Sequence, residues 1–299
     1  MSVVPVAREF TTARRLAGFV ALTKPRIIEL LLVTTLPTMV VAAHGIPRVT
    51  LMLATLVGGT LAAGGANAIN MVVDRDIDAI MRRTRNRPLV TGVVTPGQAL
   101  AFALALEVAA FGELWAAVNL LSALLAVSAM LFYVFVYTLW LKRTSRQNIV
   151  IGGAAGAVPV LVGWASVRNT VGWAPVVLFA LMFLWTPPHF WALAIRYRED
   201  YRSVDVPMLP VVASFRRTAT QILVYTVLVA VVSLVFAWTA GMGPLYWVSA
   251  AVLGVMFIGY SWQLWRDPTE ARAMKLFHWS ITYVTLLFVA MAADQLIFH

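Results

Sequence analysis

Residues 49–88 read VTLMLATLVGGTLAAGGANAINMVVDRDIDAIMRRTRNRP, an apolar run followed at once by three aspartates and five arginines. The apolar part, Val49–Met71, is long enough to cross the hydrocarbon core of a bilayer as a helix. A continuous run is typical of a spanning helix, because the strands of a membrane barrel alternate apolar and polar residues over about ten positions. The stretch therefore predicts a transmembrane helix whose end carries a polar segment, which is either a solvated loop or a site.

The composition of the chain extends this prediction to its whole length. Of the 299 residues, 61% are hydrophobic and 12% are charged, whereas soluble domains carry about 25% charged residues. Nine hydrophobic runs of about 20 residues can be marked, each long enough to span a bilayer. We therefore expect an all-α polytopic membrane protein with about nine transmembrane helices. The runs are approximately Ile27–Ala43, Val49–Met71, Ala99–Val118, Leu120–Leu141, Ile149–Ser166, Ala174–Ile195, Ala219–Ala240, Leu245–Leu264 and Leu276–Leu296.

The basic residues lie on one side of the predicted membrane. Of the 23 lysines and arginines, all but Arg48 and Arg168 fall before the first run or after an even-numbered run. Because positive charge marks the cytoplasmic face, residues 1–26 are expected to form a cytoplasmic N-terminal arm, and the C-terminus is expected outside. The net charge of +10 then reflects topology and does not indicate nucleic-acid binding. Cysteine is absent, which excludes disulfides, thiolate metal sites and covalent c-type haem attachment.

The polar stretch after the second run has helical spacing. Asn67, Asn70, Asp74 and Asp78 stand at i, i+3, i+7 and i+11, which places all four on one face of a helix. Like charges four residues apart repel, and a carboxylate at the bilayer centre costs about 2.5–3.5 kcal/mol. Both costs fall if the face lines a wet cavity in which a cation bridges the carboxylates. Carboxylate and amide oxygens suit a hard ion that keeps several waters, here Mg²⁺ bound through the phosphates of a substrate.

Arginines follow the acidic face closely. Arg82 is predicted to continue the same helical face one turn beyond Asp78, and Arg83, Arg85 and Arg87 come soon after it. Guanidinium groups beside a carboxylate-bound Mg²⁺ are suited to hold a diphosphate and to draw charge from it. The alternative interpretation is a juxtamembrane loop whose charges pair in solvent.

A second unusual stretch, residues 184–210, reads LWTPPHFWALAIRYREDYRSVDVPMLP. Pro187 and Pro188 are predicted to break or kink the sixth helix within the membrane, which is tolerated only where protein or a cavity satisfies the freed backbone groups. His189 follows them directly. Three acidic residues then lie on the same side of the membrane as the first acidic set: Glu199, Asp200 and Asp205.

These motifs carry a resemblance to a known family. The pattern Asn70-x-x-x-Asp74-x-x-x-Asp78 is similar to the first aspartate motif of the intramembrane UbiA-type prenyltransferase superfamily, which includes the ubiquinone-pathway enzymes. Within the superfamily, the chain resembles the protohaem IX farnesyltransferase branch. The stretches that carry this resemblance are LTKPRI (22–27), NMVVDRDIDAIMRRTRNRPL (70–89), YTLWLKRTSRQNIVIGGAAGAVPVLVGW (137–164), WTPPHFWAL (185–193) and EDYRSVDVPMLPV (199–211).

One motif departs from the superfamily pattern. The wider superfamily has a second Asp-x-x-x-Asp motif, whereas Asp200 and Asp205 are five residues apart, as in a reduced version of that motif. Asp205 also stands where relatives often have glycine or asparagine.

The resemblance implies both a fold and a reaction. The expected fold is a single transmembrane prenyltransferase domain over residues 1–299, a helix bundle around a central cavity with a polar cap of cytoplasmic loops. The expected reaction transfers the farnesyl group of farnesyl diphosphate to a vinyl group of haem b, which gives haem O with the help of Mg²⁺. The expected location is the bacterial cytoplasmic membrane, with a haem A synthase or a terminal oxidase assembly factor as a partner and no nucleic acid.

The resemblance also suggests roles for particular residues. The expected catalytic residues are Asn70, Asp74, Asp78 and Asp200, and three of them, Asp74, Asp78 and Asp200, are the expected metal ligands. The expected diphosphate contacts are Arg82, Arg87, Lys142 and Arg143; each could equally be an ordinary basic residue of the cytoplasmic face. His189 is expected to contact haem, and the alternative is a histidine that bonds a carbonyl freed by the prolines.

Two further patterns lie within the predicted helices. Tyr133, Tyr137 and Trp140 form a helical stripe that is predicted to line a prenyl tunnel, although an interfacial aromatic belt explains Trp140 as well. Gly152 and Gly156 are spaced for close packing between helices.

Two other function classes share part of this pattern. A transporter also has intramembrane acidic residues and a proline-broken helix, but it does not need a face of asparagine and aspartate backed by arginines. A prenyltransferase for another aromatic or quinone acceptor would share the aspartate motif; the stretches WTPPHFWAL and GGAAGAVP argue against it.

Overall fold

The computed structural model describes residues 10–299, with the side chains of residues 26–32 left out. The first part of the predicted N-terminal arm, including Arg8, and the side chain of Arg26 therefore lie outside the described residues. Over this part of the chain all regular elements are helices, and eight of them are long and apolar enough to cross a membrane. The helix α2, whose apolar segment Val33–Ala43 is shorter, is the ninth helix of the predicted bundle.

The observed helices follow the predicted runs closely. The helices α6, η1 and α7 form one continuous rod, Leu120–Thr144. The bounds are α1 Thr12–Leu22, α2 Pro25–Ala43, α3 Val49–Val73, α4 Arg75–Ile80, α5 Pro96–Ala117, α6 Leu120–Leu131, η1 Phe132–Leu141, α7 Lys142–Thr144, α8 Asn148–Arg168, α9 Trp173–Arg196, α10 Arg198–Arg202, α11 Leu209–Val212, α12 Phe215–Thr239, α13 Pro244–Arg266 and α14 Glu270–Phe298.

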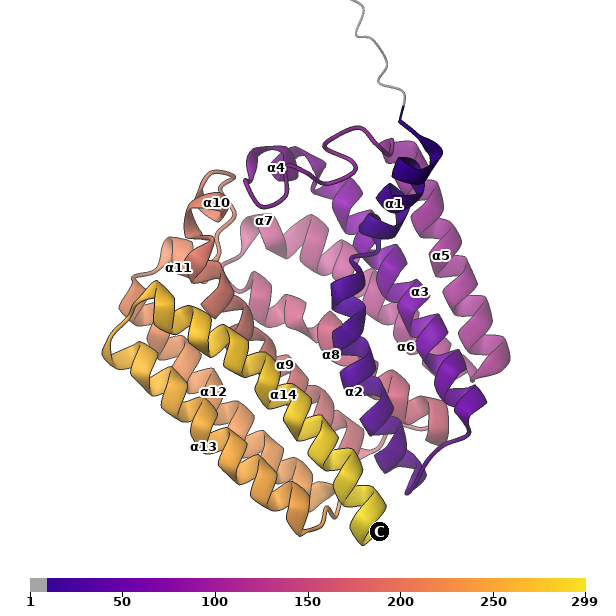
Figure 1. The fold of residues 1–299 in the computed structure, drawn as a ribbon, viewed down its shortest axis with the longest axis vertical. Coiled ribbons are helices and arrows are strands. Elements are labelled where there is room, and N and C mark those ends of the chain that lie inside the picture. Colours follow the sequence, from indigo (N-terminus) through magenta and orange to yellow (C-terminus); the bar gives the residue numbers. More distant parts are fainter. Residues whose placement is uncertain (1–9) are drawn as a thin grey trace, which may run out of the picture.

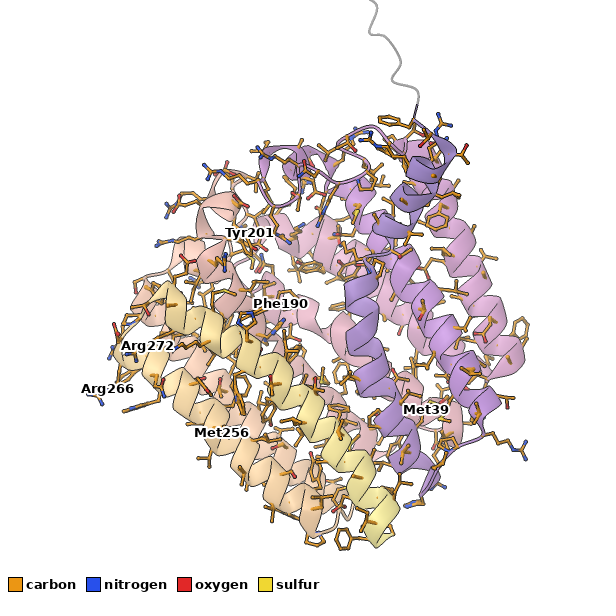
Figure 2. All side chains as sticks on the ribbon, viewed as in Figure 1. Met39, Phe190, Tyr201, Met256, Arg266 and Arg272 are labelled. Carbon is orange, nitrogen blue, oxygen red and sulfur yellow. The ribbon has the colours of Figure 1, made fainter. Side chains whose placement is uncertain are left out.

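The long helices pack as two groups with two helices between them. The helices α9, α12, α13 and α14 form one group, α3, α5 and α6 form the other, and α2 and α8 contact both (Figure 1). The short helices α4, α7, α10 and α11 gather at one end of the bundle, which we call the loop end, and the C-terminus lies at the opposite end. Figure 2 shows Tyr201 at the loop end and Phe190 deeper in the bundle. The central cavity stays a prediction.

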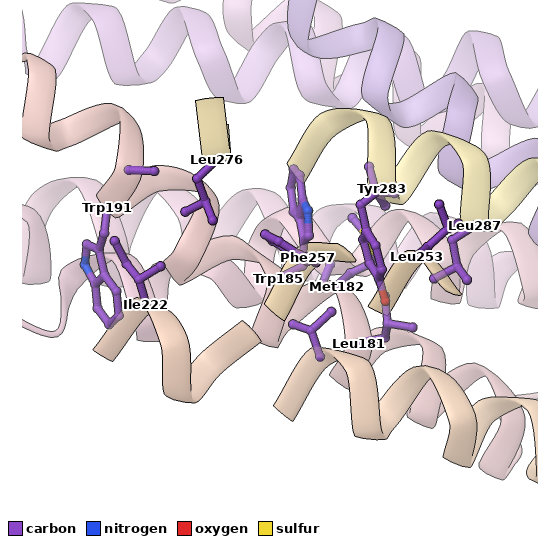
Figure 3. Close-up of a cluster of buried hydrophobic side chains, with 14 of the residues drawn as sticks. Leu181, Met182, Trp185, Trp191, Ile222, Leu253, Phe257, Leu276, Tyr283 and Leu287 are labelled. Carbon is purple, nitrogen blue, oxygen red and sulfur yellow. The ribbon is translucent and has the colours of Figure 1, made fainter. Parts of the chain in front are cut away.

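The largest cluster of buried apolar side chains fixes α9 in the bundle. Leu181, Met182 and Trp185 of α9 pack with Phe257 of α13 and Tyr283 of α14 (Figure 3). The rings of Phe257 and Tyr283 lie with their centroids 5.0 Å apart. Because lipid tails are as apolar as these side chains, close packing and interhelical hydrogen bonds hold the helices together within a membrane.

Of the two predicted outcomes for the sixth helix, a break is wrong, because α9 continues through Pro187 and Pro188 to Arg196, and a kink stays a prediction. The two prolines remove two backbone donors, but α14 holds α9 on both sides of them. The indole Nε1 of Trp185 donates to the backbone oxygen of Ser280 (2.9 Å), and His189 hydrogen-bonds the hydroxyl of the same residue. These contacts keep the helix aligned where its own hydrogen bonds are missing.

A buried carboxylate joins the last two helices at the end opposite the loop end. Asp294 of α14 is fully buried, and it accepts hydrogen bonds from the backbone N–H of Gly243 (2.6 Å) and of Tyr246 (3.0 Å). Gly243 is the N-cap of α13, and the first N–H groups of a helix have no acceptor within their own helix. The negative charge also suits the positive end of the helix dipole. Asp294 therefore caps α13 from a neighbouring helix.

Replacing Asp294 with alanine should lower the stability of the protein. Asp294→Ala leaves two backbone N–H groups buried without an acceptor, at a cost of about 1–3 kcal/mol each. The midpoint of thermal unfolding in detergent should fall clearly below that of the wild type. Asp267→Ala is the control, because Asp267 at the other end of α13 is exposed and pairs only with Arg272 at the surface. Equal midpoints for the two variants would show that the cap adds nothing.

Candidate active site

The predicted polar face lies buried where α3 passes into α4. The α-helix is interrupted at Asp74, but backbone hydrogen bonds continue the helical turn, from Asp74 N–H to Asn70 C=O and from Asp78 N–H to Asp74 C=O, both 2.9 Å. The side chains of Asn70, Asp74 and Asp78 therefore keep the helical spacing, and these residues are 3%, 0% and 2% exposed. The interpretation of a loop whose charges pair in solvent is wrong for these three residues.

The helical face ends before Arg82, so the prediction that Arg82 continues it is wrong. Met81, directly after α4, takes an extended backbone conformation with ψ of 128°. The chain then turns back, and the hydroxyl of Thr84 donates to the backbone oxygen of Asp78 (3.0 Å). As a result Arg87, and not Arg82, reaches the carboxylate of Asp78. Arg82 is exposed, and its role as a diphosphate contact stays a prediction.

Each side chain of this face has its own basic partner, and the three partners come from the α1–α2 turn, from α7 and from the loop after α4. The pairs are Lys24 Nζ with Asn70 Oδ1 (2.9 Å), Lys142 Nζ with Asp74 Oδ2, and Arg87 Nη1 with Asp78 Oδ2 (2.5 Å). We call these six residues the Asp74 cluster. Buried charges are stable only when they are paired, so these contacts bring four segments of the chain to one point.

Asp74 presents one carboxylate oxygen that has no hydrogen-bond donor. Its Oδ2 atom accepts from Nδ2 of Asn70 (2.8 Å) as well as from Lys142. Its Oδ1 atom is buried, and no residue in the described part of the chain donates a hydrogen bond to it; the guanidinium of Arg143 lies 3.8 Å away. An anionic oxygen in this situation suits a hard cation such as Mg²⁺.

The cluster fits a metal that arrives with its substrate better than a resident metal. Among the described residues no three acidic, histidine or cysteine side chains come together as a metal-binding group. Mg²⁺ typically binds proteins through one or two carboxylates and completes its shell with waters and substrate phosphates. Asp74 and Asp78 can supply those carboxylates.

A π-helix places a hydroxyl and two aromatic rings beside the cluster. In η1, Thr138 donates to the backbone oxygen of Tyr133 (2.8 Å) and accepts from Nδ2 of Asn70 (3.1 Å). Tyr133 and Tyr137 stack with centroids 5.4 Å apart. Wide helical turns of this type often occur at functional sites. Trp140 is 61% exposed, which favours the aromatic-belt alternative for that residue.

Arg143 lies against Asp76, outside the cluster. Its two terminal nitrogens donate to the two carboxylate oxygens, both at 2.7 Å, and it also donates to the backbone oxygen of Val73 (3.2 Å). The hydrogen bond from Arg143 lowers the pKa of Asp76 to about 2. The pair is therefore ionised at neutral pH and ties α7 to the α3–α4 junction, while a diphosphate contact for Arg143 stays a prediction.

Asp200 links the two acidic loops. Its Oδ2 atom accepts a hydrogen bond from the backbone N–H of Arg83 (3.2 Å), whose guanidinium lies 5.5 Å from the ring centre of Tyr197 and 3.5 Å from the hydroxyl of Tyr201. The structure thus brings the second loop onto the first. It does not bring Asp200 into one metal-binding group with Asp74 and Asp78, so the ligand role of Asp200 stays a prediction.

His189 is buried between aromatic rings in the part of α9 after the prolines. Its ring stacks on Trp185 at a centroid distance of 4.4 Å and lies 4.7 Å from Phe277. Nδ1 is 2.7 Å from the hydroxyl of Ser280 in α14. The partner is therefore a side chain of another helix, and the alternative of a carbonyl freed by the prolines is wrong.

Comparison with known proteins identifies the family. A model of the UbiA prenyltransferase family matches residues 31–286, which is most of the chain. The chain belongs to the UbiA prenyltransferase family. It is therefore a prenyltransferase, and the prediction of the enzyme class is confirmed.

Relatives within this family are similar over almost their whole length. The chain is 50% identical over 290 residues to a protein of Pseudarthrobacter chlorophenolicus, with 95% of this chain and 91% of that protein covered. It is 51% identical over 289 residues to one of Streptomyces coelicolor (94% and 91% covered), and 53% identical over 286 residues to one of Frankia casuarinae (94% and 98% covered). Each of these relatives is named protoheme IX farnesyltransferase.

Solved structures confirm the fold of the family. A structure of digeranylgeranylglyceryl phosphate synthase matches with a TM-score of 0.78 at 17% identity, covering 94% of this chain and 98% of the other. A UbiA homologue from Archaeoglobus fulgidus, bound to GPP and Mg²⁺, matches with a TM-score of 0.65 at 16% identity, covering 92% and 99%. At these identities the similarity shows the helical architecture.

Lys24 is a residue of the Asp74 cluster that the spacing of the acidic motif does not predict. Lys24 lies in the turn before α2, and its Nζ atom reaches Asn70 across 46 residues of sequence. The neighbouring backbone oxygen of Thr23 accepts from Nδ2 of Asn67 (3.2 Å), which fixes the turn on α3. Burial, together with the nearby charges of Arg87 and Lys142, lowers the pKa of Lys24 to about 7. In the sequence, the feature that could have indicated this role is a lysine directly before the proline that starts a membrane helix.

Replacing Lys24 should slow prenyl transfer without unfolding the protein. Lys24→Met removes a donor that lies among the basic groups proposed to face the leaving group, and losing one such positioned group raises the transition-state barrier, so turnover should fall about tenfold to hundredfold. Lys275→Met is the control, because Lys275 is exposed and lies on α14. A Lys24→Met enzyme whose turnover stays within about twofold of that of the control would contradict this role.

Proposed function

We propose that this chain transfers the farnesyl group of farnesyl diphosphate to a vinyl group of haem b and so makes haem O. The observation that carries the proposal is the buried Asp74 cluster, in which Asn70, Asp74 and Asp78 each meet a basic side chain. The relatives that are about half identical over nearly the whole chain support haem as the acceptor, because they are named protoheme IX farnesyltransferase. The aromatic rings that pack against His189 make an apolar environment of the kind that suits a porphyrin.

The difficult step of this reaction is ionisation of the allylic C–O bond. The leaving diphosphate gains negative charge, and the ammonium and guanidinium groups of Lys24, Lys142 and Arg87 are close enough together to stabilise it. Asp74 and Asp78 would hold Mg²⁺, which supplies Lewis-acid stabilisation of the leaving group. The structure of the Archaeoglobus fulgidus homologue with GPP and Mg²⁺ supports this pairing of metal and diphosphate.

The remaining steps form one carbon–carbon bond. The terminal vinyl carbon of haem b attacks C1 of the farnesyl cation, and the positive charge passes to the vinyl carbon next to the macrocycle. Water adds there and loses a proton, which gives the hydroxyethyl side chain of haem O. The stacked rings of Tyr133 and Tyr137 lie beside the Asp74 cluster, where their faces can stabilise the allylic cation.

Asp200 is proposed to close the site from the second loop. Its contact with the backbone of Arg83 already brings that loop onto the segment that carries Arg87. In this role Asp200 would face the diphosphate opposite Asp74 and Asp78, with Arg82 and Arg143 as further basic groups at the rim.

The diphosphate end is proposed to open to the cytoplasm of a bacterial cell. The one-sided distribution of lysine and arginine supports this orientation. The loop end would then face the cytoplasm, with the C-terminus on the other side.

The direct test of the function is a product analysis. Purified protein is incubated with haem b, farnesyl diphosphate and Mg²⁺, and the products are identified by mass; a haem that has gained a farnesyl group and one water is expected. A parallel reaction offers a phenolic quinone precursor in place of haem b. Prenylation of the phenol without any haem product would overturn the proposal in favour of the other acceptor class.

Two neighbouring aspartates should respond very differently in this assay. Asp74→Asn removes the charge that faces Lys142 and the proposed metal, so turnover should fall by about two orders of magnitude or more. Asp76→Asn removes only a partly exposed pair with Arg143 and should leave turnover within about threefold. Chelation of divalent cations should abolish the activity of the wild type, and Mg²⁺ should restore it. A fully active Asp74→Asn variant in the presence of Mg²⁺ would remove Asp74 from the mechanism.

The orientation can be tested with single cysteines, because the natural chain has none. Arg85→Cys and Ser203→Cys lie in exposed parts of the two loops and should react with an impermeant thiol reagent only from the cytoplasmic side. Arg48→Cys, between α2 and α3, should react only from the outer side. The reverse labelling pattern would overturn the proposed topology.

A further inference from the structure

The two faces of the His189 imidazole are occupied by aromatic rings. The ring of Trp185 lies nearly parallel to it, at an interplanar angle of 20°, and the ring of Phe277 is inclined by 31°. Two rings that lie 4.4 and 4.7 Å from the same centroid must occupy opposite faces of it. The ring of Phe190 stands perpendicular to the imidazole, with the centroids 5.0 Å apart, so polar contacts are confined to the part of the imidazole edge that Phe190 does not cover.

The hydrogen bonds of Ser280 decide which nitrogen carries the proton. The hydroxyl of Ser280 has one hydrogen, and it donates to the backbone oxygen of Phe277 at 2.6 Å. The contact between Ser280 Oγ and His189 Nδ1 at 2.7 Å must then have Nδ1 as its donor. A neutral imidazole with its hydrogen on Nδ1 has a free electron pair on Nε2.

The second nitrogen remains available. Within the part of the chain that the structure describes, no group hydrogen-bonds Nε2 of His189, and this atom is not among the fully buried polar atoms without partners. The position of Ser280 is itself fixed, because its backbone oxygen accepts from the indole of Trp185 at 2.9 Å. Figure 3 shows Trp185 beside α14.

We propose that Ser280 is a positioning residue, which fixes His189 in the Nδ1–H form and turns Nε2 toward the iron of the haem substrate. This inference rests on the proposed function, because it takes haem b as the acceptor. In metal sites a group that accepts from the far N–H of a histidine sets its tautomer and ring orientation, and its loss typically costs about 10–100-fold in affinity. A histidine held in this way would also fix the macrocycle, so that one vinyl group meets the farnesyl C1.

The test compares haem complexes of the purified protein by optical and resonance Raman spectroscopy. Ser280→Ala should weaken haem binding about tenfold to hundredfold and shift the iron–histidine stretching band of the ferrous complex, because that band responds to the hydrogen bond at Nδ1. Ser280→Thr keeps the hydroxyl and should restore the band and the affinity. His189→Ala should abolish the band. Affinity for farnesyl diphosphate should be unchanged in all three variants.

A matched control separates this role from a general loss of packing. Ser261→Ala removes another buried hydroxyl that bridges two helices, since Ser261 Oγ lies 2.9 Å from Thr226 Oγ1, and it should leave the haem spectrum unchanged. The proposal is overturned if Ser280→Ala binds haem with the wild-type band and affinity, or if Ser261→Ala changes both as strongly. It is also overturned if the wild type makes haem O without any histidine-ligated haem. A wild type that makes no farnesylated haem would instead overturn the proposed function.

Discussion

The ion pair between Asp74 and Lys142 is the constraint on which the loop end of this protein depends. Asp74 is fully buried, and a carboxylate in such a place is stable only beside a positive charge and hydrogen-bond donors. Lys142 supplies the charge from the far end of the rod formed by α6, η1 and α7, and Asn70 supplies a donor from the preceding turn of α3. The pair therefore fixes the distance between α3 and this rod.

The same ion pairs also determine which ligands the loop end can bind. Arg87 and Lys142 neutralise the carboxylates of Asp78 and Asp74, which explains how acidic side chains can lie buried beside a membrane-spanning helix. Under the proposed function, a diphosphate with Mg²⁺ brings both kinds of partner at once, since the metal can take the carboxylates and the phosphates can take the cations. The six side chains of the Asp74 cluster would then both hold the segments of the loop end together and bind the metal and the diphosphate.

Local patterns in the sequence predicted the helices and the acidic face well, because both depend on near neighbours. Asn70, Asp74 and Asp78 are held by hydrogen bonds four residues apart, which spacing alone can predict. The partners of this face were harder to predict. The choice of Arg87 over Arg82 depends on the extended conformation of Met81, and that conformation leaves no periodic signal.

Contacts between distant segments could not be predicted from spacing at all. Lys24 lies 46 residues before Asn70, and Ser280 lies 91 residues after His189. The continuity of α9 depends on the same distant residue, because Ser280 holds the helix on both sides of its prolines.

Asp205 shows the opposite case. Its φ of 53° lies in the left-handed region that glycine and asparagine tolerate best, so the substitutions expected at this position follow from the backbone and need no ligand role.

Two adjacent glycines of α8 set the spacing between the two halves of the candidate site. A side chain at Gly152 would collide with Tyr137 of η1, which stacks on Tyr133 beside the Asp74 cluster. A side chain at Gly153 would meet Thr186 of α9, one turn before His189. Gly156, the predicted second packing glycine, faces open space, so the pattern that matters is the adjacent pair. Because Tyr137 and Thr186 lie against α8 where it lacks side chains, larger residues at this pair would push the cationic cluster and the histidine apart. A reaction that joins a diphosphate-bearing substrate to a flat acceptor needs that distance to be fixed.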